Sequence, residues 1–362
     1  MKIAQVCHRY HPHVGGIQIH VKEISERLVK RGFEAEVLTT DPSGKLPKEE
    51  IISNVRVRRF KSWAPNEAFY FSEDLRRFLM NNSSDYDIVH AHNYHAFPAL
   101  YAAQAKNRNK LVVTSHYHGG GQTFFRNLLH IPYKFLGKSI FMEADRIICV
   151  SDYEKSLIEN HFKIDKEKIE VIPNGLNLQE FKDMERRKKD YRAILYVGRL
   201  EKYKNIQYLI KALPKLDKDI ILEIVGKGPY KKSLVKLARN LRVEGRVRFF
   251  QDLSRNELLQ RYADADLFAL LSKHEAYGIS VAEALASKTP CIVADTSALK
   301  EWVNNENCFG INNPVNLDEL VNIINNVITM RFRRSVSRLR LHDWDEVSEK
   351  LVDLYKLLLD IV

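Results

Sequence analysis

The chain has 362 residues, of which 45% are hydrophobic and 28% are charged, and its formal net charge is +11. This length and composition exclude a disordered or fibrous protein and fit two globular domains of ordinary size. The positive charge favours anionic partners such as nucleotide sugars, acidic lipids or nucleic acid.

The four cysteines, Cys7, Cys149, Cys291 and Cys308, lie far apart in the sequence. Their spacing matches no zinc site, redox motif or disulfide framework, so we expect a reducing compartment, the cytoplasm. The apolar stretch near the N-terminus is too short for a signal peptide. The longest segment without Lys, Arg, Asp or Glu contains three histidines and a proline, so we expect no membrane span.

Short apolar runs alternate with amphipathic segments along the whole chain. The predicted strands are residues 3–7, 35–39, 55–60, 88–90, 111–114, 146–150, 194–197, 220–225, 247–250, 267–271 and 291–294. Two series of alternating strands and helices predict two Rossmann-like domains with parallel sheets. We place them at residues 1–168 and 169–343, divided near residues 169–175, where a further predicted strand ends in a Pro-Asn-Gly turn. A final amphipathic helix is expected at 344–362.

The loop after the first predicted strand ends in Gly15 and Gly16, which open a predicted helix over residues 16–31. Glycines at a helix start predict a site for an anion or an acceptor. The third glycine of the dinucleotide fingerprint is missing, which disfavours an oxidoreductase that uses NAD.

Ten of the thirteen histidines lie in the first 130 residues, in groups at positions 8, 11 and 13, at 90, 92 and 95, and at 116 and 118. Neighbouring imidazoles can bind zinc or copper. Each group follows a predicted strand, however, where a sugar-binding site also needs neutral hydrogen-bonding rings. We therefore predict no metal site. The Asp-x-Asp sequences at 85–87 and 264–266 precede strands and are predicted to be surface or capping residues.

Residues 88–142 contain no Asp or Glu, and the second half of this segment mixes aromatic residues with Arg126, Lys134 and Lys138. This composition is typical of a surface that lies on anionic lipid. An ordinary helix pair packed on the sheet is the alternative.

In the second half, three turns that follow predicted strands carry glycines. Gly198-Arg199 leads to Lys204, Gly226 and Gly228 flank a lysine, and Gly278 separates a strand from an alanine-rich helix. A free helix N-terminus at Gly278 binds anions, and arginine and lysine grip a diphosphate. Glu275 and Glu283 flank that turn, and carboxylates beside a phosphate site are better suited to hydroxyl groups. Together these features indicate a nucleotide sugar.

The two glutamates resemble the Glu-x7-Glu motif of retaining glycosyltransferases of family 4, which have the GT-B fold: two Rossmann-like domains that face a central cleft. The resemblance places Glu275 against the donor sugar and Glu283 against the ribose. The amides of Gly278, Ile279 and Ser280 would lie near the diphosphate. Ala276 and Tyr277 replace the usual glycine and phenylalanine.

Further motifs resemble the same family. Arg199 and Lys204 match its phosphate-binding pair, although Asn205 replaces the glycine often found next. Gly226 and Gly228 match a turn near the nucleotide base, His116 matches a histidine that lines the donor sugar, and Gly15 and Gly16 match its first loop.

The resemblance implies transfer of a hexose from a UDP- or GDP-sugar to a glycan or lipid-linked acceptor, with retention, and without metal or cofactor beyond the donor. Catalysis would fall to His116, Arg199, Lys204 and Glu275. We expect a cytoplasmic protein, with the inner face of the membrane as a candidate docking surface. The alternatives are a nucleotide-sugar 2-epimerase of the same fold and a basic nucleic-acid-binding protein, although no nucleic-acid motif is evident.

Overall fold

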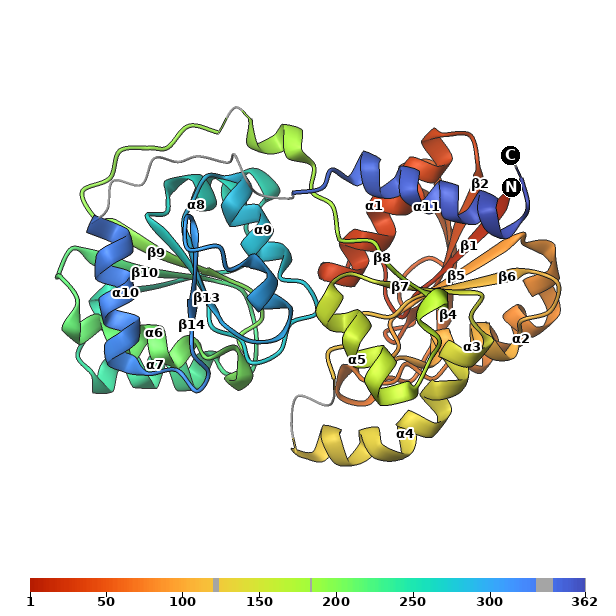
Figure 1. Ribbon diagram of the computed structural model, residues 1–362, viewed down its shortest axis with the longest axis horizontal. Helices are drawn as coiled ribbons and strands as arrows, with labels where there is room; N and C mark the ends of the chain where they lie inside the picture. Colours follow the sequence, from red (N-terminus) through yellow and green to blue (C-terminus); the bar gives the residue numbers. More distant parts are fainter. Residues whose placement is uncertain (120–123, 183, 330–340, 362) are drawn as a thin grey trace. The chain divides into compact units, whose positions relative to one another are not determined.

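The computed structural model describes residues 1–119, 124–182, 184–329 and 341–361 (Figure 1). The chain divides into two compact units, one comprising Met1–Gly175 with His342–Val362 and the other Leu176–Leu341. Each unit is built on a largely parallel sheet with helices, which confirms the expected pair of α/β domains. Residues 169–175, which the sequence analysis placed in the second domain, belong to the first unit.

The first unit contains an eight-stranded sheet in the order β3-β4-β2-β1-β5-β6-β7-β8. Its strands are β1 (Lys2–Val6), β2 (Glu34–Asp41), β3 (Glu49–Ile52), β4 (Val55–Lys61), β5 (Ile88–His92), β6 (Lys110–Thr114), β7 (Arg146–Cys149) and β8 (Ile169–Val171). All neighbouring strands pair in parallel except β3 and β4. The strand order reverses direction between β1 and β5, which is where open α/β sheets bind ligands.

The helices of this unit are α1 (Gly16–Lys30), α2 (Glu73–Asn82), α3 (Phe97–Gln104), α4 (Phe124–Glu143), α5 (Asp152–Phe162) and α11 (Trp344–Leu358). The final helix α11 begins at a capping box of Asp343 and Glu346 and lies beside α1. Its Val347, Leu351 and Tyr355 are buried with Ile24 of α1. A Cβ atom on Gly175 would lie 2.7 Å from the Trp344 backbone, so glycine is needed there.

The second unit contains a six-stranded parallel sheet in the order β11-β10-β9-β12-β13-β14. Its strands are β9 (Arg192–Val197), β10 (Ile220–Val225), β11 (Val247–Phe250), β12 (Leu267–Leu270), β13 (Cys291–Ala294) and β14 (Cys308–Ile311). Its helices are α6 (Ile206–Ala212), α7 (Lys231–Asn240), α8 (Arg255–Asp264), α9 (Ile279–Ala286) and α10 (Leu317–Thr329). This is the Rossmann strand order, with its switch point between β9 and β12.

The buried apolar runs explain why the central strands were predictable. All residues of β10, β12 and β13 are buried, as expected for strands covered on both faces. The short strands β3 and β14 were not predicted. β3 is a four-residue edge strand that begins with two glutamates, and β14 contains a glycine, so neither carries a strong strand signal.

Candidate functional site

The loops after β9 and β12 meet at the switch point of the second sheet, because these two strands pair in parallel. The backbone amide of Lys273, after β12, donates to the Tyr203 carbonyl oxygen, after β9, at 3.0 Å. Asn205 Nδ2 donates to the Leu271 carbonyl oxygen at 2.9 Å. These bonds hold the two loops in register at the edge where parallel sheets bind their ligands.

Asn205 stands where the family often has glycine, and its backbone adopts a conformation that glycine readily takes. Its φ is +60°, in the left-handed region, and it caps the start of α6. Asparagine tolerates this conformation better than most residues with a side chain. The substitution therefore preserves the turn that presents Lys204.

Lys204 and Glu275 form an ion pair across these two loops. Their side chains are only 12% and 17% exposed. Burial lowers the pKa of Lys204, but the adjacent Glu275 carboxylate, together with Tyr203, outweighs that effect and raises the pKa above its usual value. Lys204 therefore stays protonated, and the Glu275 carboxylate lies directly beside its ammonium group.

Arg199 lies in the same loop but differs from Lys204 in its surroundings. Its side chain is 63% exposed and pairs with Glu201 at 3.3 Å. The Tyr196 hydroxyl donates to the Arg199 carbonyl oxygen at 2.8 Å and so holds the backbone of the turn. Arg199 is thus an accessible guanidinium on an anchored loop.

Gly278 joins the Glu275 loop to helix α9. Its φ of +95° favours glycine, and an added Cβ atom would lie 2.9 Å from Leu299. The amides of Ile279 and Ser280 follow in the first helical turn, where backbone N–H groups have no acceptor within the helix. The Glu275 amide donates to Ser297 Oγ at 3.2 Å, which fixes the loop against the segment after β13.

Glu283 is buried on α9 and already has two partners. It forms an ion pair with Arg255, and the Tyr262 hydroxyl donates to its Oε2 atom at 2.9 Å. Arg255 also contacts Glu180 at 2.8 Å. Sequence reasoning missed Arg255 and Tyr262, because they lie on α8 and no motif links them to α9. Each oxygen of Glu283 retains a further lone pair that can accept a hydrogen bond from a hydroxyl group.

Gly226 and Gly228 have a close-packing role that the sequence did not reveal. A Cβ atom on Gly226 would lie 2.0 Å from the Gly198 carbonyl oxygen, and one on Gly228 would lie 2.3 Å from that of Leu200. These glycines let the loops after β9 and β10 touch backbone to backbone. A groove lined by Lys231, Lys232 and Lys236 continues from Gly228 along α7.

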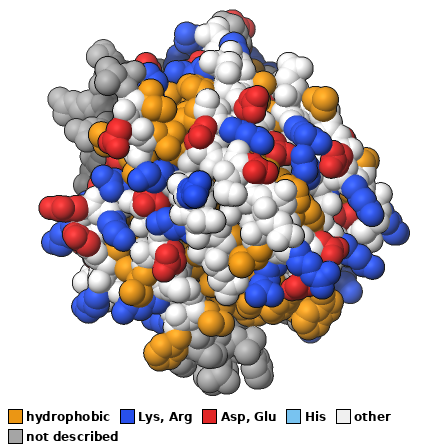
Figure 2. All heavy atoms as spheres, turned by 90° about the vertical axis from the view of Figure 1, so that its right-hand side faces the viewer, with side chains coloured by type: hydrophobic (Ala, Val, Ile, Leu, Met, Phe, Trp, Pro, Cys, Tyr) orange, Lys and Arg blue, Asp and Glu red, His pale blue; other side chains and the backbone are white. Residues whose placement is uncertain are grey.

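The charged side chains on one face of the molecule are of mixed sign. On the face drawn in Figure 2, lysine and arginine side chains are interspersed with aspartate and glutamate. That face therefore lacks the continuous basic stripe that follows a nucleic-acid backbone.

In the first unit, the predicted glycines lie at the start of α1. Gly15 caps the helix with an extended φ of −177°, and Gly16 is its first residue. His116 follows β6 with a φ of +47° and is 9% exposed. Its neighbours Ser115 and Tyr117 both donate hydrogen bonds to the buried Glu154 carboxylate, which fixes the turn.

The structure brings His116 together with His92 and with His20, which the sequence analysis had not grouped with any other histidine. A signal for His20 was available: it lies three residues after Ile17 and four before Ile24, on the apolar face of α1. His11 is exposed, and His95 stacks on His118 with ring centroids 4.7 Å apart. The sequence groups therefore do not correspond to the cluster in space.

The two Asp-x-Asp sequences were predicted to be surface or capping residues; Asp85 and Asp87 are exposed, whereas Asp264 is buried. Asp87 accepts a hydrogen bond from the Lys2 amide at 2.7 Å. Asp266 accepts one from the Ala193 amide at 2.8 Å, and Asp264 accepts one from the Arg187 amide at 2.8 Å. Among the described helices, none is both long and apolar enough to cross a bilayer.

Two sequence families cover the two units. Residues 14–180 match Glycosyltransferase Family 4, and residues 178–341 match Glycosyl transferases group 1. An uncharacterized glycosyltransferase of Methanocaldococcus jannaschii is 29% identical over the full length of both chains. A glycogen synthase of Mycobacterium tuberculosis is 30% identical over 84% of this chain and 80% of that protein.

A third relative is more distant. The GPI3 subunit of phosphatidylinositol N-acetylglucosaminyltransferase from Saccharomyces cerevisiae is 23% identical over 98% of this chain and 82% of its own.

Solved structures share the fold at low sequence identity. Sucrose-phosphate synthase from Thermosynechococcus elongatus superposes with a TM-score of 0.84 and 19% identity, over 99% of this chain and all of that one. The Anabaena HepE protein in complex with UDP gives a TM-score of 0.78 at 18% identity, over 99% of this chain and 100% of that one. The fold is thus that of GT-B glycosyltransferases.

Proposed function

The chain belongs to the glycosyl transferases of group 1, and from this membership we propose that it transfers a hexose from a nucleoside diphosphate sugar with retention at the anomeric carbon. The observation that carries the proposal is the Lys204–Glu275 ion pair at the switch point, beside the N-terminus of α9. A cation, a carboxylate and free helix amides at one point suit a diphosphate joined to a sugar.

In the proposed reaction the bond between the anomeric carbon and the diphosphate oxygen breaks, and the acceptor hydroxyl oxygen bonds to that carbon from the same face. The hydroxyl proton passes to the departing diphosphate. Arg199, Lys204 and the amides of Ile279 and Ser280 would stabilise the negative charge of the departing diphosphate. Glu275 would hold the sugar hydroxyls once Lys204 turns to the phosphate. Catalysis then rests on electrostatic stabilisation and positioning.

The remaining site residues have supporting roles in this proposal. Glu283, whose oxygens already accept from Arg255 and Tyr262, would accept the ribose hydroxyls on its free lone pairs. His116 would form a hydrogen bond with the donor sugar, and Gly15 and Gly16 would lie on the acceptor side. Gly226 and Gly228 would lie near the base.

We propose UDP-sugars as the first donors to test, because HepE, which shares the fold, was solved with UDP. For the acceptor, the GPI3 subunit is named for a transferase that acts on phosphatidylinositol, which supports a lipid-linked acceptor. Helix α4 adds a second support. Its Phe135, Leu136 and Met142 are 80%, 50% and 58% exposed, next to Lys134 and Lys138. The side chain of Arg126, predicted to join them, lies outside the described residues.

Release of nucleoside diphosphate tests the proposal. Purified protein is incubated with UDP-, GDP- and ADP-sugars and a lipid extract, with and without EDTA. We expect release from one donor class at equal rates in both conditions, because Arg199 and Lys204 supply the positive charge. Release that stops in EDTA and returns with magnesium or manganese would overturn the metal-independent mechanism. Isomerised sugar formed from donor alone would instead support an epimerase.

A further inference from the structure

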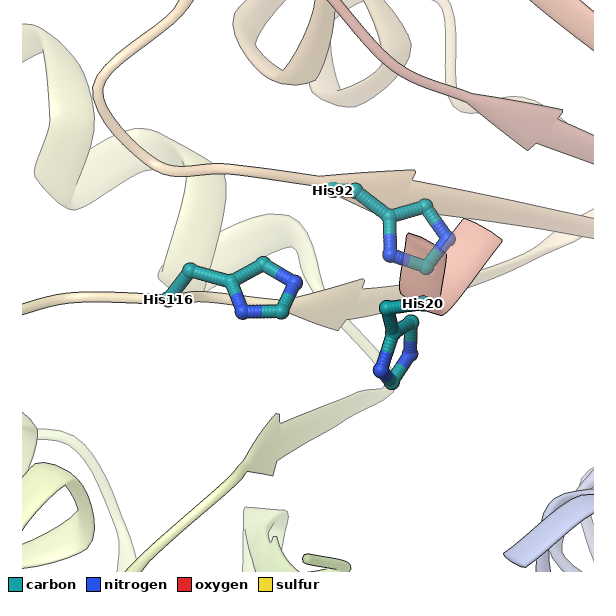
Figure 3. A group of neighbouring side chains, drawn as sticks. All are labelled: His20, His92 and His116. Atoms are coloured by element: carbon teal, nitrogen blue, oxygen red, sulfur yellow. The ribbon is translucent and has the colours of Figure 1, made fainter. Parts of the chain in front are cut away.

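Three buried histidines from different elements of the first unit surround one point. His20 comes from α1, His92 ends β5 and His116 follows β6. One nitrogen from each ring lies within 4.8 Å of the other two. Figure 3 shows the three rings gathered around a shared space. Their exposed fractions are 1%, 0% and 9%.

Each of these rings has a buried nitrogen without a hydrogen-bond partner in the structure: His20 Nε2, His92 Nδ1 and His116 Nε2. The neighbouring His90 differs, because its two nitrogens contact the Tyr355 hydroxyl at 2.6 Å and Thr114 Oγ1 at 2.7 Å. A buried polar atom without a partner costs about 1–3 kcal/mol. Three rings that meet at one point and each carry such an atom indicate a ligand.

The opposite nitrogens of two rings are held by amide oxygens. His20 Nδ1 lies 2.7 Å from Asn174 Oδ1, and His92 Nε2 lies 2.6 Å from Gln5 Oε1. The Gln5 amide nitrogen lies 3.4 Å from the Tyr355 hydroxyl, which orients its oxygen toward His92. An amide oxygen only accepts, so the ring nitrogen facing it carries the proton. The unpartnered nitrogen then carries a lone pair.

Lone pairs on neutral imidazoles, with the other ring nitrogen bound to an oxygen, are the donor arrangement found around bound transition metals. Such nitrogen donors suit zinc, copper or cobalt, whereas magnesium and calcium prefer oxygen.

We propose that His20, His92 and His116 bind one divalent transition metal ion, zinc being the first to test, with the fourth position open to water. Zinc–nitrogen bonds of 2.0–2.1 Å place tetrahedral ligands about 3.4 Å apart. The widest pair here, at up to 4.8 Å, closes by roughly 1.4 Å on binding.

The site also predicts how zinc affects transfer, and this step rests on the proposed function. His116 is assigned to the donor sugar, so an ion on its Nε2 atom competes with that contact. Zinc is therefore expected to inhibit transfer and to take no part in the chemistry, which is consistent with the EDTA-resistant activity that the proposed function predicts.

Zinc titration of the full chain tests the site. Protein freed of metal with EDTA is dialysed and titrated with Zn²⁺ in a calorimeter, and with Co²⁺ followed by its visible absorption. We expect one equivalent of either ion and no heat with Mg²⁺. His20→Ala and His92→Ala should lose binding, whereas His11→Ala, which changes an exposed histidine, should retain it.

Asn174→Leu provides a second variant that keeps all three rings. Loss of the oxygen that orients His20 should weaken zinc binding by about 10- to 100-fold. Unfolding curves of each variant, compared with that of the wild type, show whether a loss of zinc binding reflects a loss of folding. The proposal would be overturned if the wild-type chain took up no zinc, or if His20→Ala and Asn174→Leu both bound zinc as tightly as the wild type. A buried water would then be the occupant. Zinc uptake without inhibition would keep the metal site and overturn the role of His116 in transfer.

Discussion

Glu275 partners Lys204, a largely buried lysine, at the switch point of the second sheet. We predict that Glu275→Gln lowers turnover at saturating donor by about a hundredfold or more, the scale of losing one transition-state contact. Glutamine keeps an acceptor for Lys204, whereas alanine would leave that buried cation unpaired. The matched control is Glu185→Gln, an exposed carboxylate in the same unit. Wild-type turnover in a folded Glu275→Gln protein would contradict the assignment.

Glu154 is a second residue whose role is clear from its contacts. Its fully buried carboxylate accepts from Ser115 Oγ and the Tyr117 amide on either side of His116, and from the Val150 amide at 2.6 Å. Glu154→Gln replaces one acceptor oxygen with a donor and leaves an N–H or O–H group unsatisfied. We predict a loss of roughly 1–3 kcal/mol in the free energy of unfolding, measured in urea.

Glu159→Gln on the same helix is the control for this change, because that side chain is partly exposed. An unfolding free energy for Glu154→Gln within about 0.5 kcal/mol of the wild type would show that the turn holds without it.

At the scale of elements, helix α4 presents apolar and basic side chains to solvent. Each lysine near an anionic bilayer contributes about 1 kcal/mol. We therefore predict that Lys134→Glu with Lys138→Glu weakens binding to anionic vesicles by roughly 30-fold or more in co-sedimentation at low salt. The charge-matched control is Lys45→Glu with Lys48→Glu, two exposed lysines of the same unit. Equal binding by the two double variants would exclude α4 as the docking element.

The loop after β1 carries a buried histidine that makes stability depend on pH. Burial, followed by Arg9 and His13, lowers the pKa of His8 to about 3. Between pH 6.5 and 3 the unfolded chain binds a proton that the folded chain does not, so acidification destabilises the fold. At pH 5 this protonation of the unfolded chain lowers the free energy of unfolding by roughly 2 kcal/mol.

We predict that His8→Gln loses less stability than the wild type between pH 7 and pH 5, by about that amount, in urea unfolding. His11→Gln, in the same loop but exposed, should follow the wild type. Parallel pH curves for His8→Gln and the wild type would contradict the prediction.

For the whole molecule, the sequence predicted the two-domain α/β fold because the buried strands are apolar runs and each is followed by a turn. It also identified Lys204 and Glu275, whose motifs follow adjacent strands. It missed Arg255 and His20, since contacts between α8 and α9, or between α1 and β5, depend on packing over long sequence separations. It also missed the close backbone contact at Gly226, because that contact joins loops that follow two different strands.

The central claim is that the loops at the switch point of the second sheet bind a nucleoside diphosphate sugar. Thermal unfolding of the wild type and of Lys204→Ala with UDP-, GDP- and ADP-sugars tests it most directly. One donor class at a hundred times its dissociation constant should stabilise the wild type by about 2.7 kcal/mol. The same concentration should stabilise Lys204→Ala much less. Equal stabilisation of both proteins, or of neither by any donor, would contradict the account.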